Sequence, residues 1–340
     1  MSVLKILVLM HKDLVPPDRK VEIEELNASP WNTEYDVMES LNKLGHNVMP
    51  LGVLGDLEII RKTLEEFKPH IVFNLLEEFD GNTTFDQHVV SYLELKKIPY
   101  TGCNPRGLTL ARDKALSKKI LAYHKIPVPK FFVVPKNQKL SRRKNFQFPL
   151  IVKSLTEEAS LGISQASVVS DLKSLQERVS FIHENLDTDA IVEQYIEGRE
   201  LYVGILGNQK LKVLPVWELK LDKMPGSSRK FATEKVKWDE KYREKYRIRS
   251  IQAVSLSEEE VKRIQDICKR AYKRLGMNGY ARIDLRYTED KKIYILEANP
   301  NPGIAEGEEF PLSAEKIGMN YKDVLSKILT LGLSWYQSRK

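Results

Sequence analysis

A β-hairpin is predicted by the runs Tyr280-Ala-Arg-Ile-Asp-Leu-Arg-Tyr287 and Ile293-Tyr-Ile-Leu-Glu-Ala-Asn-Pro-Asn-Pro-Gly303. Both runs alternate between apolar and polar residues, and the polar segment Thr288-Glu-Asp-Lys291 between them is typical of a turn. Asn299-Pro-Asn-Pro-Gly303 ends the second strand, because proline cannot donate to a sheet ladder. The polar side chains of the hairpin therefore lie where a strand opens into a loop, and functional sites concentrate at such places.

Four polar side chains of this hairpin suggest a metal site. Side chains alternate between the faces of a strand, so Arg282 and Asp284 share one face of the first strand, and Glu297 and Asn299 share one face of the second. If the register joins these faces, two carboxylates and an amide oxygen converge, which suits Mg²⁺ when substrate phosphates complete its ligand shell. Arg282 would then meet negative charge that develops beside the metal. The alternative is an ordinary hairpin with salt bridges on its solvent-exposed face.

Length and composition indicate a globular chain of several domains. The 340 residues suggest two or three domains, and 42% hydrophobic with 30% charged residues is ordinary for a soluble protein. No apolar run approaches a membrane span, and Lys5 interrupts the apolar N-terminus, which argues against a signal peptide. Cys103 and Cys268 are predicted to be free thiols that serve packing. We therefore expect a cytoplasmic protein without a membrane partner.

The net charge of +7 raises the question of nucleic-acid binding. Basic residues do not form one block but are interleaved with acidic residues, as in the segment from Lys235 to Arg249. An anionic nucleotide substrate explains a mild positive excess equally well. We therefore expect no nucleic-acid partner, although a nucleic-acid binder remains an alternative that would leave the carboxylate pair unexplained.

The first hundred residues predict an α/β fold with a parallel sheet, because strands and helices alternate. No glycine follows the first strand in His11–Pro17, so the fingerprint of a nicotinamide-dinucleotide site is missing. Capping residues predict two of the helix starts, namely a Thr33/Asp36 capping box and an Asp56 cap. The expected strands are 4–10, 47–51 and 70–75, and the expected helices are 33–45, 56–67 and 84–96.

Residues 99–105 suggest a domain boundary, because the segment contains two prolines and a glycine. Beyond it the pattern changes to an α+β order that ends in a helix over 321–331. Residues 222–250 are long, charged and low in periodicity, which is typical of a functional loop. The other expected elements are helices 111–124, 171–183 and 257–275, strands 131–134, 150–153, 163–169 and 190–195, and a hairpin of 201–206 with 210–214.

Arg282-Ile-Asp-Leu285 and Leu296-Glu-Ala-Asn-Pro-Asn-Pro-Gly303 resemble the magnesium signature of ATP-grasp enzymes, in the branch of the D-alanine–D-alanine ligases. The resemblance covers nearly the whole chain and is strongest in its last two thirds. It implies ATP and Mg²⁺ as cofactors, with two metal ions that Mn²⁺ can replace, and Asp284, Glu297 and Asn299 as ligands. It also implies an ATP-grasp fold of three domains: an N-terminal α/β domain (1–105), a central lid domain (106–196) and a C-terminal catalytic domain (197–340).

Two lysines, and a segment that resembles the family's hinge between the central and C-terminal domains, match the family's nucleotide contacts. Lys114 and Lys153 resemble the lysines that hold the phosphates. Without the resemblance, Lys114 would be interpreted as a solvent-exposed lysine on a helix. In Ala190-Ile-Val-Glu-Gln-Tyr-Ile-Glu-Gly-Arg-Glu200, the resemblance assigns Glu193 to the adenine amino group and Glu200 to the ribose hydroxyls. A carboxylate suits a vicinal diol because it accepts two hydrogen bonds. The backbone around Tyr195 and Ile196 would pair with the edge of the ring.

The remaining phosphate contacts lie in two loops. Lys237 in the long loop would reach the terminal phosphate, with Trp238 beside it, and Lys235 is a competing candidate. Ser160 and Gly162 match the phosphate-binding loop of the family, in which backbone N–H groups wrap phosphate.

The chain also departs from the family's pattern. Ala159 replaces a hydroxyl that positions D-alanine, and Glu157 and Glu158 bring negative charge close to the expected phosphates. The loop after the first strand lacks the family's glutamate, and Asp13 is the nearest acidic candidate.

After Gly303 the family's D-alanine ligases carry a serine for a substrate carboxylate, whereas this chain has the acidic run Glu306-Gly-Glu-Glu309. Acidic side chains disfavour a bound carboxylate, so Glu306, Glu308 and Glu309 suggest a cationic substrate.

The resemblance implies an ATP-dependent carboxylate–amine ligase that acts on a small-molecule acid and amine through an acyl phosphate. Arg282 and the backbone N–H of Gly303 would stabilise the oxyanion. The departures predict substrates other than two D-alanines. The alternatives are D-alanine–D-alanine ligase itself and a regulatory protein that binds ATP without ligation. A homodimer is compatible with the sequence.

Overall fold

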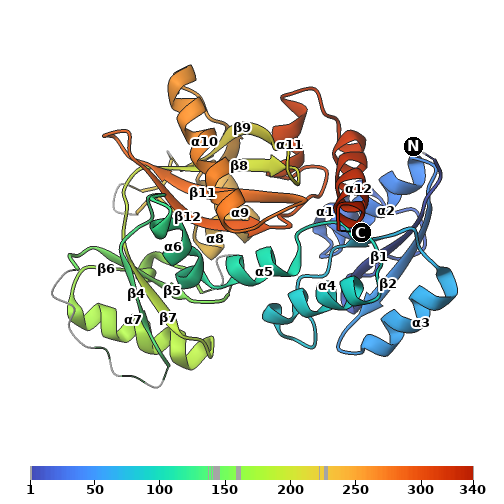
Figure 1. Ribbon diagram of the computed structural model, residues 1–340. Helices are drawn as coiled ribbons and strands as arrows, with labels where there is room; N and C mark the ends of the chain where they lie inside the picture. Colours follow the sequence, from blue (N-terminus) through green and yellow to red (C-terminus); the bar gives the residue numbers. More distant parts are fainter. Residues whose placement is uncertain are drawn as a thin grey trace.

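The computed structural model describes residues 2–136, 138, 140, 146–157, 162–221, 223–225 and 229–339. It is a mixed α/β structure with one parallel three-stranded sheet and two antiparallel sheets of four and five strands (Figure 1). Within the described ranges, no helix combines the length and the apolar character of a bilayer span. Cys103 and Cys268 are free and buried, which confirms their predicted packing role.

The N-terminal sheet is parallel, as the alternation of strands and helices predicts. β1 (Lys5–His11) lies between β2 (Asn47–Val53) and β3 (Ile71–Asn74). Residues 6–10 have no exposed surface, because helices cover both faces of the sheet. α3 (Leu57–Phe67) and α4 (Asp86–Leu95) pack on one face, and α2 (Asn32–Lys43) and α12 (Tyr321–Gln337) pack on the other.

The start of α2 differs from the prediction. The helix begins at Asn32, so Thr33 lies inside its first turn and the expected Thr33/Asp36 capping box does not form. The carboxylate of Asp36 instead accepts a hydrogen bond of 2.9 Å from the backbone N–H of Glu306. This long-range contact joins α2 to the acidic segment that follows the hairpin.

The helix expected over 111–124 is divided into α5 (Pro105–Arg112) and α6 (Lys114–Tyr123). Asn104 caps α5, and Pro105 stands at its first position, which is compatible with a helix start. Asp113 accepts a hydrogen bond of 2.8 Å from the backbone N–H of Leu116, so it caps a new helix where the sequence pattern suggested continuity. The division fixes Lys114 at the first residue of α6.

The four-stranded sheet follows with the order β4-β7-β5-β6. Its strands are β4 (Phe131–Val134), β5 (Leu150–Ser154), β6 (Val168–Val169) and β7 (Ala190–Gln194). α7 (Leu172–Asn185), which Asp171 caps, covers one face through Leu175, Val179 and Ile182. β6 is much shorter than the strand expected over 163–169, because residues 165–167 form a 3₁₀ turn.

The five-stranded sheet has the order β10-β9-β8-β11-β12. It contains β8 (Arg199–Leu206), β9 (Lys212–Lys220), β10 (Arg249–Gln252), β11 (Tyr280–Tyr287) and β12 (Ile293–Pro300). α10 (Glu258–Arg274), which begins with a capping box of Ser257 and Glu260, packs on this sheet. The segment expected as a long loop contains α8 (Glu234–Trp238) and α9 (Glu240–Lys245), and α11 (Glu309–Glu315) follows the hairpin.

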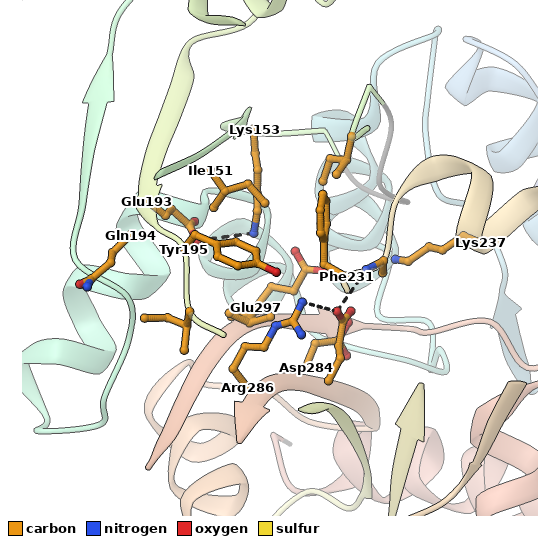
Figure 2. A pocket seen from close by; sticks show the side chains of 15 residues that line it. Ile151, Lys153, Glu193, Gln194, Tyr195, Phe231, Lys237, Asp284, Arg286 and Glu297 are labelled. Atoms are coloured by element: carbon orange, nitrogen blue, oxygen red, sulfur yellow. Dashed lines mark hydrogen bonds and ion pairs between the residues drawn. The ribbon is translucent and has the colours of Figure 1, made fainter. Parts of the chain in front are cut away.

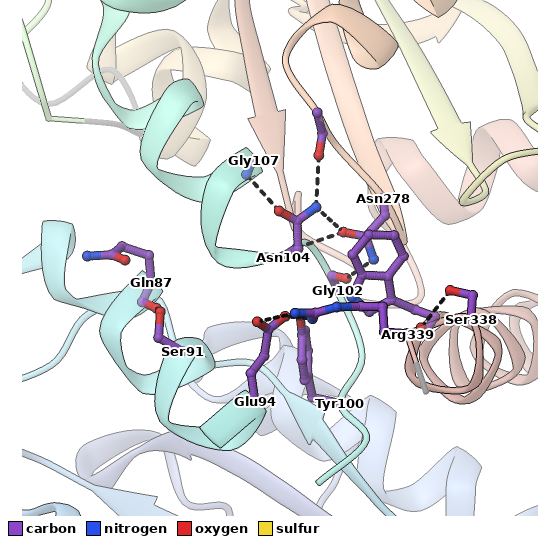
Figure 3. A network of polar contacts seen from close by, with 12 residues as sticks. Gln87, Ser91, Glu94, Tyr100, Gly102, Asn104, Gly107, Asn278, Ser338 and Arg339 are labelled. Carbon is purple, nitrogen blue, oxygen red and sulfur yellow. Dashed lines mark hydrogen bonds and ion pairs between the residues drawn. The ribbon is translucent and has the colours of Figure 1, made fainter. Parts of the chain in front are cut away.

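A polar network joins the N-terminal part of the chain to the five-stranded sheet (Figure 3). Asn104 donates through Nδ2 to Oδ1 of Asn278 at 2.6 Å and to the carbonyl of Gly276 at 2.8 Å. Arg339, just beyond α12, pairs with Glu94 of α4 through both of its terminal nitrogens. Figure 1 accordingly shows α12 beside the N-terminal sheet, although α12 is the last helix in the sequence.

The predicted domain boundaries after residues 105 and 196 stay a proposal. β3 is the last strand of the N-terminal sheet before the first boundary, and β7 is the last strand of the four-stranded sheet before the second.

Gly279→Ala tests the close contact that ends this network. Gly279 has a φ of +72°, and a Cβ there would overlap the carbonyl oxygen of Gly102. Gly45→Ala is the matched control, because Gly45 has a φ of +82° with no atom within 4 Å of an added Cβ. Backbone strain alone destabilises by about 1–2 kcal/mol, so we expect Gly45→Ala to lose that amount and Gly279→Ala to lose clearly more in thermal unfolding followed by circular dichroism. Equal losses would contradict a contribution of the Gly102 contact.

Candidate active site

The hairpin register brings the predicted metal ligands together. β11 and β12 are antiparallel neighbours, with Asp284 directly opposite Glu297 and Arg282 directly opposite Asn299. The four side chains therefore share one face of the five-stranded sheet, as the alternation of the two runs predicts. The register shifts next to this pair: Leu285 lies opposite Ile295, so Leu296 of β12 is the extra residue of a bulge and the alternation along β11 is kept.

Arg282 is held on the carboxylate of Asp284. Its Nε donates to Oδ1 at 2.7 Å and its Nη2 donates to Oδ2 at 2.9 Å, while Nη1 reaches Glu309 at 3.3 Å. The guanidinium carbon also lies 4.8 Å from the ring centre of Tyr202. Burial raises the pKa of Asp284, and the Arg282 charge opposes that rise. Arg282 thus keeps a charged carboxylate inside the protein.

Glu297 is stabilised by positive charge from several elements. Burial alone would raise its pKa, but the ammonium groups of Lys114, Lys237 and Lys153 outweigh burial and lower it. Lys118 contributes as well. These lysines come from α6, β5 and α8, so residues far apart in sequence converge on one carboxylate. A cluster of this kind also attracts the phosphates of a nucleotide.

The donors present fit Mg²⁺. Within the described ranges, no three His, Cys, Asp or Glu side chains gather in a way that could hold a metal without further ligands. Asp284 and Glu297 provide two carboxylates, and Asn299 adds an amide whose Nδ2 is buried without a hydrogen-bond partner among the described residues. Mg²⁺ is usually held by one or two carboxylates together with substrate phosphates. Asp284, Glu297 and Asn299 match that pattern.

A narrow pocket lies between the four-stranded and five-stranded sheets, and we call it the inter-sheet pocket (Figure 2). Its volume is about 60 Å³, whereas sites for small molecules usually hold about 300–1,000 Å³. The inter-sheet pocket is therefore smaller than a nucleotide site. The predicted nucleotide and metal residues among its lining are Lys153, Glu193, Tyr195, Ile196, Glu200, Lys237, Asp284 and Glu297.

Glu193 lies fully buried between two lysines. Its Oε1 is 3.3 Å from Nζ of Lys118 and its Oε2 is 3.5 Å from Nζ of Lys153. The nearby positive charges outweigh burial and lower the pKa of Glu193. Lys118 also donates to the backbone carbonyl of Leu296, beside Glu297. The sequence interpretation missed Lys118, although its position four residues after Lys114 places both lysines on one face of α6.

Glu200 is held by partners from three segments. Its Oε2 accepts hydrogen bonds from Nη2 of Arg286 at 2.7 Å and from the backbone N–H of Ala232 at 3.1 Å. Its Oε1 accepts from the hydroxyl of Tyr202 at 3.0 Å. Arg286, which the sequence interpretation also missed, lies two residues after Asp284 and so shares its face of β11. Any contact of Glu200 with a ribose would use the remaining lone pairs.

The structure distinguishes the two candidate phosphate lysines of the long loop. Lys237 lines both the inter-sheet pocket and a second, larger cavity, whereas Lys235 is exposed and lines neither. Thr233 caps α8 and thereby sets the turn on which both lysines stand. Lys114 lies at the start of α6, where its Nζ donates to the carbonyl of Glu157.

The second cavity, which we call the large cavity, has a volume of about 900 Å³. It lies next to the inter-sheet pocket and shares Lys237 with it. Asp13 is exposed and Glu306 is exposed, and neither lines the cavity. Ser160 lies outside the described residues. The predicted catalytic, metal or substrate residues that do line the cavity are Lys237, Trp238, Arg282, Asn299, Gly303 and Glu308.

Comparisons with known proteins agree with this geometry. A family model described as "D-ala D-ala ligase C-terminus" matches residues 120–330. The D-alanine--D-alanine ligase of Desulforudis audaxviator is 30% identical over 298 residues, which cover 87% of this chain and 90% of that protein. A Sinorhizobium fredii protein named uncharacterized protein y4sG is 30% identical over 311 residues, with 88% of each chain covered.

Structural comparison leads to the same fold. The crystal structure of the D-alanine--D-alanine ligase from Bacillus anthracis complexed with ATP gives a TM-score of 0.76 at 22% identity, over 99% of this chain and 100% of that chain. This fold, with two antiparallel sheets around a pocket lined by lysines and carboxylates, together with the family model and the ligase relatives, identifies an ATP-grasp ligase, an enzyme that forms C–N bonds. The chain belongs to the D-alanine–D-alanine ligase family.

Lys118→Met tests whether Lys118 positions Glu193 and the neighbouring backbone. The variant leaves Glu193 with one lysine partner and leaves the carbonyl of Leu296 without its donor. Breaking a buried ion pair costs about 3–5 kcal/mol, so we expect a lower melting temperature and an ATP affinity weakened about tenfold or more, measured by calorimetry. Lys119→Met, an exposed lysine on the same helix, is the control and should change neither quantity. Unaltered ATP affinity in folded Lys118→Met would contradict the positioning role.

Proposed function

We propose that this protein is an ATP-dependent carboxylate–amine ligase whose substrates are not two D-alanines. The observation that carries the proposal is the opposition of Asp284 and Glu297 across β11 and β12, with lysines on one side and Arg282 on the other. A structural hairpin needs no such set of buried charges. The products are an amide, ADP and phosphate.

Lysines and carboxylates would orient the nucleotide. Lys114, Lys153 and Lys237 would bind its phosphates, and Glu193 and Glu200, which line the inter-sheet pocket, would contact the adenosine once the pocket has opened. Mg²⁺, as two ions that Mn²⁺ can replace, would neutralise phosphate charge when it is bound by Asp284, Glu297 and Asn299. The substrate carboxylate attacks the γ-phosphate to give an acyl phosphate, and the amine then displaces phosphate from the acyl carbon.

Arg282 would stabilise the oxyanion of that second step. It borders the large cavity from the same strand as Asp284, so its free edge can meet charge that develops on the acyl group. The backbone N–H of Gly303 is the second proposed donor. A Cβ at this position would overlap the carboxylate of Glu308, so any larger residue would have to displace that side chain.

The segment with α8 and α9 would exclude water from the acyl phosphate. Val236, Lys237, Trp238 and Arg243 from this segment line the large cavity, and the indole of Trp238 is exposed at its margin. A reactive intermediate needs such a cover, since water would hydrolyse it.

The lining of the large cavity supports a substrate other than D-alanine. Glu308 and Glu309 both line it, and burial raises the pKa of Glu308 while the neighbouring Glu309 raises it further. A substrate carboxylate placed there would meet repulsion. The second candidate function is D-alanine–D-alanine ligation, because curated relatives carry the name D-alanine--D-alanine ligase.

Glu297→Gln tests the carboxylate pair. The substitution keeps the shape of the side chain but removes a metal-ligating charge, and metal stabilisation of phosphoryl charge is worth several kcal/mol. We expect kcat/KM for ATP to fall about a hundredfold or more, with a higher Mg²⁺ concentration needed for half-maximal rate. Glu289→Gln in the exposed turn of the same hairpin is the control. Full turnover by Glu297→Gln would exclude the proposed mechanism.

A screen of ADP release over pairs of acids and amines tests the substrate assignment. We expect weak release with D-alanine as sole substrate and stronger release with at least one pair that includes a cationic partner, with products identified by mass spectrometry. Glu297→Gln protein should be silent with every pair. Robust synthesis of D-alanyl-D-alanine would refute the substrate assignment, and ATP binding without ADP release from any pair would favour a regulatory protein.

A further inference from the structure

Glu34 is a buried carboxylate in the wall of the large cavity. It lies in the first turn of α2, and only 5% of its surface is exposed. It belongs to the N-terminal part of the chain, whereas Arg282 and Asn299 reach the same cavity from the five-stranded sheet. A substrate in this cavity can therefore touch Glu34 and the reacting centre at once.

Glu34 differs from the other buried carboxylates of the described chain. Asp86 pairs with Arg112 at 2.7 Å, and Glu200 pairs with Arg286 at 2.7 Å. The remaining buried carboxylates have cationic partners too: Glu193 with Lys118, Glu218 with Arg199, and Asp284 with Arg282. Within the described ranges, no ion pair and no hydrogen bond from another residue reaches the carboxylate of Glu34, which contacts only its own backbone N–H.

The surroundings of Glu34 add negative charge. Burial, together with the nearby carboxylates of Glu77 and Glu308, raises its pKa to about 7. These three acids come from separate places: α2, the segment after β3 and the segment after β12. Burying an unpaired carboxylate is unfavourable, so Glu34 destabilises the protein unless another molecule supplies a positive charge.

We propose that the large cavity takes a substrate with a cationic side chain, an ammonium or a guanidinium that is separate from any α-ammonium and from the reacting carboxylate or amine, and that Glu34 binds this group with Glu308 beside it. The inference rests on the proposed ligase function and names the substrate class of the same site. A charge-assisted hydrogen bond in a buried place is among the stronger polar contacts. Asp36 supports the arrangement, because its contact with the backbone of Glu306 holds α2 against the segment that carries Glu308.

Isosteric ligand pairs test the cationic group. Lysine is compared with norleucine and arginine with citrulline, each as both enantiomers, by calorimetry on the whole protein with Mg²⁺ and a non-hydrolysable ATP analogue. We expect the unmodified protein to bind one cationic member about tenfold or more tightly than its neutral isostere. Glu34→Gln should abolish the difference. Glu39→Gln should preserve it, because Glu39 is on the same helix but pairs with Lys43 at the surface.

Thermal unfolding without substrate provides a second readout. A raised carboxyl pKa means that the folded state loses stability as pH rises from the ordinary glutamate range through about 7. Glu34→Gln should therefore melt at a higher temperature than the unmodified protein at pH 8, with a smaller difference at pH 5. A variant that melts lower at pH 8 would show that the carboxylate is already satisfied, and would overturn the proposal.

The outcomes separate this inference from the proposed function. Equal binding of every cationic ligand and its neutral isostere, or an undiminished preference in Glu34→Gln, refutes the cationic subsite even if neutral pairs release ADP. Absence of ADP release from all pairs refutes the ligase proposal, whereas a preference for the cation that depends on Glu34 still supports the subsite.

Discussion

The opposition of Asp284 and Glu297 is the constraint on which the site depends. Two carboxylates face each other across neighbouring strands, inside a protein where like charges repel strongly. Arg282 compensates one of them from the same strand, and the lysines of α6, β5 and α8 compensate the other. The positive charge therefore comes from the four-stranded sheet, from the helices that precede it and from the segment over the cavity. Because these elements belong to different parts of the fold, the charge around Glu297 depends on how they pack against the hairpin.

The sequence predicted what local patterns encode. Alternating runs predicted the hairpin and placed Asp284 and Glu297 on joinable faces, and the caps at Asp56 and Ser257 follow from their side chains alone. The resemblance to a family then selected lysines that an isolated helix pattern would have left as solvated residues. The division at Asp113 was not predicted, because apolar spacing continues through it and only the side-chain cap reveals a new helix.

Other site residues could not be found from local pattern because their roles arise from tertiary pairing. In the sequence, Lys118 is one of several lysines on a helix. Its role becomes visible only in the fold, where Glu193 of β7 lies 3.3 Å from it. The role of Arg286 as the ion-pair partner of Glu200 follows only from the pairing of β8 with β11, which places the two residues opposite each other. Conversely, Asp13 looked suitable because it follows β1, yet its side chain is exposed and lies outside the large cavity. In each case the deciding quantity is a distance across the fold, which sequence spacing does not contain.

Acidic and basic side chains line both cavities, and the cavities differ in whether a cation pairs with their buried carboxylates. Lysines surround Glu297 beside the inter-sheet pocket, whereas Glu34 in the wall of the large cavity has no cationic partner among the described residues. Under the two proposals above, a phosphate would bind beside the lysines and a cationic group beside Glu34, while Lys237 borders both cavities. Stability alone would favour a neutral residue at this position or a cationic partner for Glu34, since burying a neutral or paired group costs less free energy than burying an unpaired carboxylate. The presence of Glu34 is understandable if the cationic group of the substrate pairs with it. Binding would then relieve the unfavourable burial of the carboxylate, and this gain would add to the affinity for the cation.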